Sequence, residues 1–239
     1  MARISRKDLK KDELRETFSH GAESVVEHRR GLGEIAGIVL VIVLAVLGWR
    51  YYSAHQTAKA SAALDDAMTI FNARILTPGA PAQPGEVTYT DEDNKYADAA
   101  KKFDAVADSY GRTRPGQEAR YFAGICQLHL THIDQAEKEL TTAANSGDPA
   151  VQALANFQLA NVYTKMGRND EGIKIYQGMI AKPTVIVPKP MVMLALADVY
   201  KRTNPSEAIK VLNQIKTEFP DSPAAEEANK LLEMPAGKS

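Results

Sequence analysis

Four segments of the chain repeat one pattern: "YADAAKKFDAV" from Tyr96, "IDQAEKELTTA" from Ile133, "NDEGIKIYQGM" from Asn169 and "PSEAIKVLNQI" from Pro205. The fourth position of each segment holds a small residue, and these residues are spaced by intervals of 37, 36 and 36. They are Ala99, Ala136, Gly172 and Ala208. Four positions further, each segment has a large apolar residue: Phe103, Leu140, Tyr176 and Leu212. A fixed period of this length predicts a stack of similar units.

The stretches that precede the last three segments also repeat, as "FAGICQL", "QLANVYTKMG" and "ALADVYKRT". A small residue recurs in them at Gly124, Ala160 and Ala197. Small residues at fixed offsets let two antiparallel helices approach closely, and large residues fill the space before the next pair. The sequence therefore predicts an all-α solenoid of helical hairpins over residues 53–239, in which each hairpin buries its apolar face against its neighbours.

The end of the array has the signals of a capping helix. In "FPDSPAAEEANKLLEM", Pro220 ends one helix and Ser222 can cap the next. We expect a terminal capping helix over 222–234, with a polar outer face that keeps the last repeat soluble.

Two irregular segments interrupt the repeats. A helical stretch, Thr57–Ile75, is followed by "TPGAPAQPGEVTYTD" over 77–91, where prolines and glycines exclude regular structure. This loop insertion is either a tolerated lengthening of the first hairpin or a loop that contacts a partner. A second segment, "TVIVPKP" over 184–190, is typical of an extended connector between repeats.

An apolar run near the N-terminus, Ile35–Trp49, carries no charged or strongly polar side chain. Its fifteen positions fall short of the roughly 20 that a membrane-spanning helix needs, but amphipathic flanks extend it. We therefore predict one transmembrane helix over 32–52. The residues expected to lie at the membrane interface are Trp49, Arg50, Tyr51 and Tyr52.

A buried core helix and a cleaved signal peptide are the two other interpretations of this run. A buried core helix would have polar residues at a helical period, whereas Ile38–Leu47 is apolar all round. A cleaved signal peptide has a short basic leader and small residues at the cleavage site. Here 34 residues precede the run, and it ends in bulky Trp49 followed by Arg50 and two tyrosines, so a retained anchor is favoured and a cleaved signal is the alternative.

The basic residues predict the orientation of this helix. Eight lysines and arginines precede the run, whereas only Arg50 and Lys59 follow it closely. The positive-inside rule then places a tail, 1–31, in the cytoplasm and residues 53–239 outside. Within the tail we expect at most a short amphipathic helix around Leu14–Val26.

The composition argues against several functions. The formal net charge of -1 and the lack of a basic stripe disfavour nucleic-acid binding. The single cysteine, Cys126, excludes an internal disulfide and is typical of a small buried residue. Together with His129 and His132 it forms a C-x2-H-x2-H row, but His132 falls in a turn and no fourth ligand is near.

Two further segments resemble binding motifs but lack essential residues. Asp91–Asn94 is acidic enough for calcium, but Lys102 stands where an EF-hand needs glutamate, so we expect this segment to start a helix. The closing "AGKS" has leucine where a phosphate-binding loop needs its first glycine. No hydrolase, zincin or dinucleotide-binding motif is present. The sequence thus predicts a protein that is not an enzyme and has no cofactor, metal or small-molecule substrate.

The repeat resembles the tetratricopeptide repeat, whose small and aromatic positions match Ala160, Gly172, Tyr163 and Tyr176. The tryptophan of that consensus is missing, and the period exceeds its usual 34 residues. The resemblance implies a peptide groove lined by the first helix of each pair. The groove candidates are Tyr121, Ile125, Phe157, Asn161, Leu194 and Asp198. Such residues suit extended apolar segments, although each could equally pack against the next repeat.

The whole arrangement resembles the ancillary subunit family of the bacterial SecYEG translocon. That resemblance is most specific in six residues: Gly48, Trp49, Arg50, Tyr51, His55 and Gln56. It implies a single-pass inner-membrane protein whose repeats face the periplasm, contact the translocon and periplasmic chaperones, and assist exported proteins. The loop insertion and "FPDSPAAEEA" depart from this family. That ending is more similar to envelope proteins of the outer-membrane assembly and Tol-Pal systems, so an adaptor for one defined partner is the alternative.

Overall fold

The computed structural model describes residues 29–77 and 81–233, with side chains described from residue 37. Most of the predicted tail, including the helix expected around Leu14–Val26, and the last residue of the predicted capping helix lie outside the described residues. The chain divides into two compact units, Met1–His55 and Gln56–Ser239, and each is described by itself.

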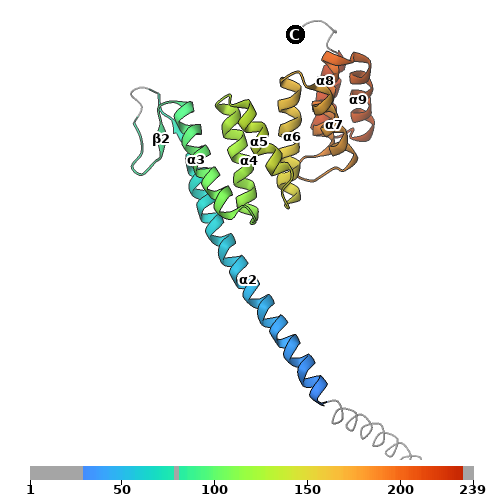
Figure 1. Ribbon diagram of the computed structural model, residues 1–239. Helices are drawn as coiled ribbons and strands as arrows, with labels where there is room; N and C mark the ends of the chain where they lie inside the picture. Colours follow the sequence, from blue (N-terminus) through green and yellow to red (C-terminus); the bar gives the residue numbers. More distant parts are fainter. Residues whose placement is uncertain (1–28, 78–80, 234–239) are drawn as a thin grey trace, which may run out of the picture. The chain divides into compact units, whose positions relative to one another are not determined.

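The predicted all-α fold is confirmed, with helices in successive hairpins (Figure 1). The helices are α2 (Arg29–Phe71), α3 (Glu92–Tyr110), α4 (Arg114–His129), α5 (Ile133–Ala144), α6 (Pro149–Lys165), α7 (Asn169–Ala181), α8 (Lys189–Thr203), α9 (Pro205–Glu218) and α10 (Pro223–Glu233). From α3 to α10, each helix packs against the one that follows it in the chain. The contacts are therefore local in sequence, as expected for a solenoid.

Helix α2 differs from the prediction, which separated a spanning helix from a second stretch, Thr57–Ile75. The structure has one helix of 43 residues that ends at Phe71. Residues 53–56 contain neither proline nor glycine, so nothing in the local sequence ends the helix there. Ile75 instead belongs to a short strand.

The loop insertion contains some regular structure, contrary to the prediction. Strand β1 (Arg74–Ile75) pairs in parallel with β2 (Thr88–Tyr89), and β2 lies within the predicted insertion. Threonine and tyrosine favour strands, whereas the prolines and glycines of the loop lie before them. Arg74 also donates to both carboxylate oxygens of Glu86, at 3.0 and 2.9 Å.

The core of the repeat unit follows the sequence period. The four large apolar residues at equivalent positions are at most 2% exposed. They are Phe103, Leu140, Tyr176 and Leu212. At the N-terminal end of the unit, Phe71 from α2 makes edge contacts with the rings of Tyr96 and Phe103. At the other end, the alanines of α10 pack on Leu212 and cover the last hairpin.

Two turns inside hairpins have a left-handed residue at the same place in the repeat. Thr131 lies between α4 and α5 with φ 59°, and Gly167 lies between α6 and α7 with φ 80°. The two positions are 36 residues apart, which is the repeat period. Glycine adopts this conformation without steric cost, whereas threonine does not.

Five of the described helices start at a short polar side chain that caps them. The backbone N–H of Asn94 donates to Asp91, at 2.8 Å, so the acidic segment expected to start a helix does cap α3. Thr113 caps α4, Asp148 caps α6 and Asn204 caps α9. Ser222 accepts from the N–H of Ala225, so α10 starts where the sequence signals placed a helix. These caps satisfy backbone donors that the helices leave unpaired.

Candidate protein-interaction surface

The six predicted groove residues divide among different packing clusters. Tyr121 and Ile125 on α4 are half-buried against a cluster that includes Leu140 and Leu159. Phe157 on α6 contacts the Tyr176 ring edge to face, with centroids 6.0 Å apart. All three therefore pack between helices and present only part of their surface to solvent.

The remaining groove candidates lie further along the array. Asn161 is half-buried, and its Oδ1 accepts a hydrogen bond of 2.6 Å from the hydroxyl of Tyr176. Leu194 on α8 is half-buried against the last core cluster. Asp198 is exposed, 3.7 Å from the guanidinium of Arg202. Binding of a peptide by these six residues therefore stays a proposal.

The small residues that define the repeat lie at tight helix contacts. A Cβ at Gly172 would lie 2.4 Å from Cγ2 of Thr164, and one at Gly124 would lie 2.8 Å from Cγ of Leu140. Both distances are too short for real carbon contacts, so only glycine allows the present spacing of the helices. The alanines at the other such positions are at most 2% exposed: Ala136, Ala160, Ala197 and Ala208.

The N-terminal unit exposes an apolar surface. The large side chains from Ile38 to Leu47 are between 46% and 66% exposed, and those of Trp49, Tyr51 and Tyr52 between 59% and 78%. Among the described residues, one helix is long and apolar enough to cross a membrane, over Gly37–Phe71. This near-terminal helix thus has the length and composition of a single membrane anchor or of a signal sequence.

The cysteine and histidine row does not converge on a metal site. Burial raises the pKa of the Cys126 thiol to about 12, so this thiol is not a ready ligand or nucleophile. His129 stacks on the ring of Tyr96, with centroids 3.9 Å apart, and Nδ1 of His132 contacts Oε1 of Gln127. Among the described residues, no group of three histidine, cysteine or acidic side chains could hold a metal ion.

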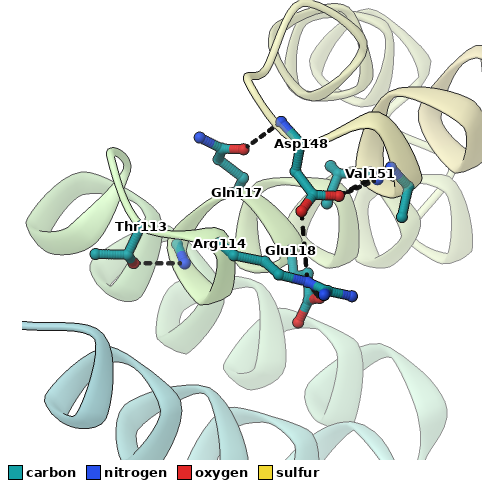
Figure 2. A network of polar contacts seen from close by, with 8 residues as sticks. Thr113, Arg114, Gln117, Glu118, Asp148 and Val151 are labelled. Atoms are coloured by element: carbon teal, nitrogen blue, oxygen red, sulfur yellow. Dashed lines mark hydrogen bonds and ion pairs between the residues drawn. The ribbon is translucent and has the colours of Figure 1, made fainter. Parts of the chain in front are cut away.

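A polar network joins the starts of α4 and α6, the first helices of two successive hairpins (Figure 2). Oδ1 of Asp148 accepts from the N–H groups of Ala150 and Val151, at 2.8 and 3.1 Å. The N–H of Asp148 in turn donates to Oε1 of Gln117, at 2.9 Å. Nε of Arg114 lies 3.5 Å from the same aspartate. An aspartate before a proline is a sequence signal for a helix cap, so the role of Asp148 at α6 can be predicted. Its hydrogen bond to Gln117, 31 residues earlier, has no such signal.

A second network joins three helices around Arg168. Its guanidinium lies 2.8 Å from Glu137 on α5 and 2.6 Å from Glu171 on α7, and 4.1 Å from the ring centroid of Tyr163 on α6. The hydroxyl of Tyr163 also donates to Glu137, at 3.0 Å. Hydrogen bonds to both carboxylates hold the pKa of Arg168 above its usual range. This arginine therefore stays charged and links one hairpin to the next.

Comparison with known families supports the repeat architecture. Residues 32–182 match a family described as a tetratricopeptide repeat-like domain, and residues 191–222 match a tetratricopeptide repeat. No curated protein matched the chain. Tetratricopeptide repeat proteins are typically non-catalytic scaffolds that bind other proteins. Because the first match spans more than half of the chain, the protein belongs to the tetratricopeptide repeat-like domain family.

Proposed function

We propose that this protein is a membrane-anchored, chaperone-like scaffold at the SecYEG translocon, which assists exported proteins on the periplasmic side. One observation carries the proposal: a single family match covers both an exposed apolar helix and repeats of a protein-binding type. The match starts at residue 32, so the apolar helix is part of the family's domain. This supports a retained anchor over a leader that is cleaved before the domain begins.

The anchor accounts for location and orientation. The basic tail stays in the cytoplasm under the positive-inside rule, and Trp49, Arg50, Tyr51 and Tyr52 lie at the outer interface of the membrane. The repeats from residue 53 onward then face the periplasm. Attachment beside a channel raises the local concentration of the repeats around emerging chains, so even weak contacts are effective.

The half-buried side chains of α4, α6 and α8 suit the binding of client segments. Tyr121, Phe157 and Leu194 combine apolar surface with partial exposure. Extended apolar segments of unfolded clients bind such surfaces through side-chain burial, with little demand for one defined sequence. A promiscuous client range follows from that chemistry.

The test is capture of the full-length protein from membranes in mild detergent, followed by identification of the proteins that come with it. A version lacking residues 32–52 is the control. We expect enrichment of the translocon channel and periplasmic chaperones, and loss of both in the control. Enrichment of outer-membrane assembly, Tol-Pal or cell-division proteins instead would contradict the translocon assignment.

An envelope adaptor that binds one defined partner is the second candidate. The observation that favours it is the structured base of the loop insertion, where β1 pairs with β2 and Arg74 pairs with Glu86. A defined loop suits a defined partner better than a range of unfolded clients. The two functions differ in an aggregation assay: a chaperone slows the aggregation of several unrelated unfolded proteins, whereas an adaptor does not.

A further inference from the structure

A pocket of about 390 Å³ opens between α6, α7 and the connector that leads to α8, away from the groove candidates. Its apolar lining includes Ala153, Ile175, Met179 and Val187. The volume lies in the range of ligand-binding pockets. None of the six groove residues lines it, so the pocket offers a separate contact surface.

The charges around this pocket have one sign. Lys174 and Lys182 line it together with Gly178. Lys174 and Gly178 lie on α7, and Lys182 is the C-cap residue that follows this helix. Lys174 and Gly178 are four residues apart and lie on the same face of α7, and the N–H of Lys182 donates to the carbonyl of Gly178, at 3.1 Å. Both lysines are exposed and form no ion pair within the described part of the chain. No aspartate or glutamate of that part lines the pocket.

The polar lining is suited to a peptide backbone. Nδ2 of Asn156 donates to the carbonyl of Gln152, at 2.9 Å, which leaves the Asn156 Oδ1 as an acceptor. Both residues line the pocket. An acceptor beside an apolar floor can pair with a backbone N–H, which an acyl chain does not have.

The connector extends the apolar surface beyond the pocket. Thr184 and Val187 line the pocket, and the N–H of Val187 donates to Oγ1 of Thr184, at 3.1 Å. Between them, Val185 is 94% exposed and Ile186 is 50% exposed. This bond holds the connector in a tight turn that leaves its two apolar side chains exposed to solvent.

We propose that this pocket binds an extended peptide segment of a partner protein in which an apolar side chain is next to a carboxylate. The apolar side chain enters between Ile175, Met179 and Val187, and the carboxylate pairs with Lys174 and Lys182. The carboxylate comes either from the end of the partner chain or from an aspartate or glutamate. The inference rests on the protein-binding role proposed above, and it is independent of the translocon assignment.

The test uses the full chain in lipid nanodiscs and three fluorescein-labelled peptides, with fluorescence anisotropy as the readout. One peptide ends in Val-Leu with a free carboxylate, the second is its C-terminal amide, and the third is an amide with an internal Leu-Glu pair. We expect at least one carboxylate peptide to bind at least about tenfold more tightly than the neutral amide. The first and third peptides distinguish the two sources of the carboxylate.

Two variants locate the binding on this pocket. Gly178→Phe places a bulky side chain at the pocket lining, at an exposed position where an added Cβ meets no atom within 4 Å. The pair Lys174→Glu and Lys182→Glu reverses its charge. The matched controls are Gly178→Ala and the pair Lys102→Glu and Lys216→Glu, which changes the net charge equally at exposed sites elsewhere. We expect both pocket variants to weaken binding at least about tenfold and both controls to preserve it.

Two results would overturn the proposal. One is that no carboxylate peptide binds better than the neutral amide, or that pocket variants and controls behave alike. The other is that a fluorescent fatty acid, dansylamino-undecanoate, binds at the pocket while the peptides do not. Because no translocon is present in the nanodiscs, failure of the capture experiment above leaves this result unaffected.

Discussion

Oε1 of Gln117 accepts a hydrogen bond of 2.9 Å from the backbone N–H of Asp148, a residue 31 positions later in the chain. The bond joins the first turn of α4 to the residue that caps α6 (Figure 2). It connects the first helices of two successive hairpins at their N-terminal ends. The register between these hairpins therefore depends on a polar contact as well as on apolar packing.

Replacing Gln117 by alanine should remove this link and leave the N–H of Asp148 without its partner. We expect the free energy of unfolding to fall by about 1 kcal/mol, the usual contribution of one hydrogen bond. Chemical denaturation followed by circular dichroism measures the change. Gln135→Ala, at an exposed position of α5, is the control and should leave stability unchanged. Equal stability of the two variants would argue against a role of Gln117 in the register.

Asp148→Ala should destabilise the chain more, because it removes the cap of α6. Loss of an N-cap side chain costs about 1 to 2 kcal/mol. Asp148→Asn keeps an acceptor for the N–H groups of Ala150 and Val151 and loses the ion pair with Arg114, whose side chain is largely exposed. We expect its melting temperature to stay close to that of the unchanged protein. A large loss in the asparagine variant would show that the charge, rather than the cap, stabilises this site.

Two glycines of α7 should respond oppositely to the same substitution. Gly172→Ala places a Cβ 2.4 Å from Thr164 and 2.9 Å from the carbonyl of Ala160, so the hairpin must open. We expect a loss of roughly 1 to 3 kcal/mol. Gly178→Ala adds a Cβ in open space within the same helix and should stabilise by up to about 1 kcal/mol. Thermal melts of both variants check the prediction, and an unchanged melt for Gly172→Ala would count against close helix contact there.

Thr131→Gly should relieve backbone strain in the turn between α4 and α5. A β-branched residue at φ 59° is strained, whereas glycine is not. The strain energy that is relieved only slightly exceeds the conformational entropy that glycine loses on folding, so we expect the free energy of unfolding to rise by about 0.5 kcal/mol. The reverse change at the equivalent turn, Gly167→Thr, should destabilise. If both changes lower the melting temperature, strain at Thr131 is not significant.

Asp104 on α3 should make stability depend on pH. Burial, followed by the nearby Glu139 carboxylate, raises the pKa of Asp104 above its usual value, against the attraction of Arg120. A carboxyl group with a raised pKa in the folded state favours folding below its unfolded pKa and opposes it above the folded pKa. Asp104→Asn should therefore raise the melting temperature at pH 7, and the gain should vanish as the pH falls below about 4. A gain that does not change with pH would point to hydrogen bonding instead.

The repeat period was sufficient to predict the all-α solenoid, because each hairpin repeats the same small and large positions. The period also places Phe103 and Tyr176 in the core, where the structure has them. The predictions failed where local signals are weak. Nothing in residues 53–56 marks a helix end, and the pairing of β1 with β2 depends on a contact across the insertion.

The candidate site was harder to predict than the fold. Repeat alignment selects which face of a helix a residue occupies, but it does not decide how much of that face the next repeat covers. Phe157 and Asn161 illustrate this, because both contact Tyr176. The link between Gln117 and Asp148 and the pocket beside Lys182 arise from residues far apart in sequence, so neither had a local signal.

The packing of each helix from α3 to α10 on the next has a consequence for how the chain acquires its structure. Contacts that are close in sequence form early, and the core of one hairpin is completed by the helix that follows it, as α8 does for Tyr176 of α7. A chain delivered from its N-terminus, whether by a ribosome or through a channel, can then fold hairpin by hairpin in the order of its emergence. Helix α10 then emerges after the hairpin of α8 and α9 and covers it.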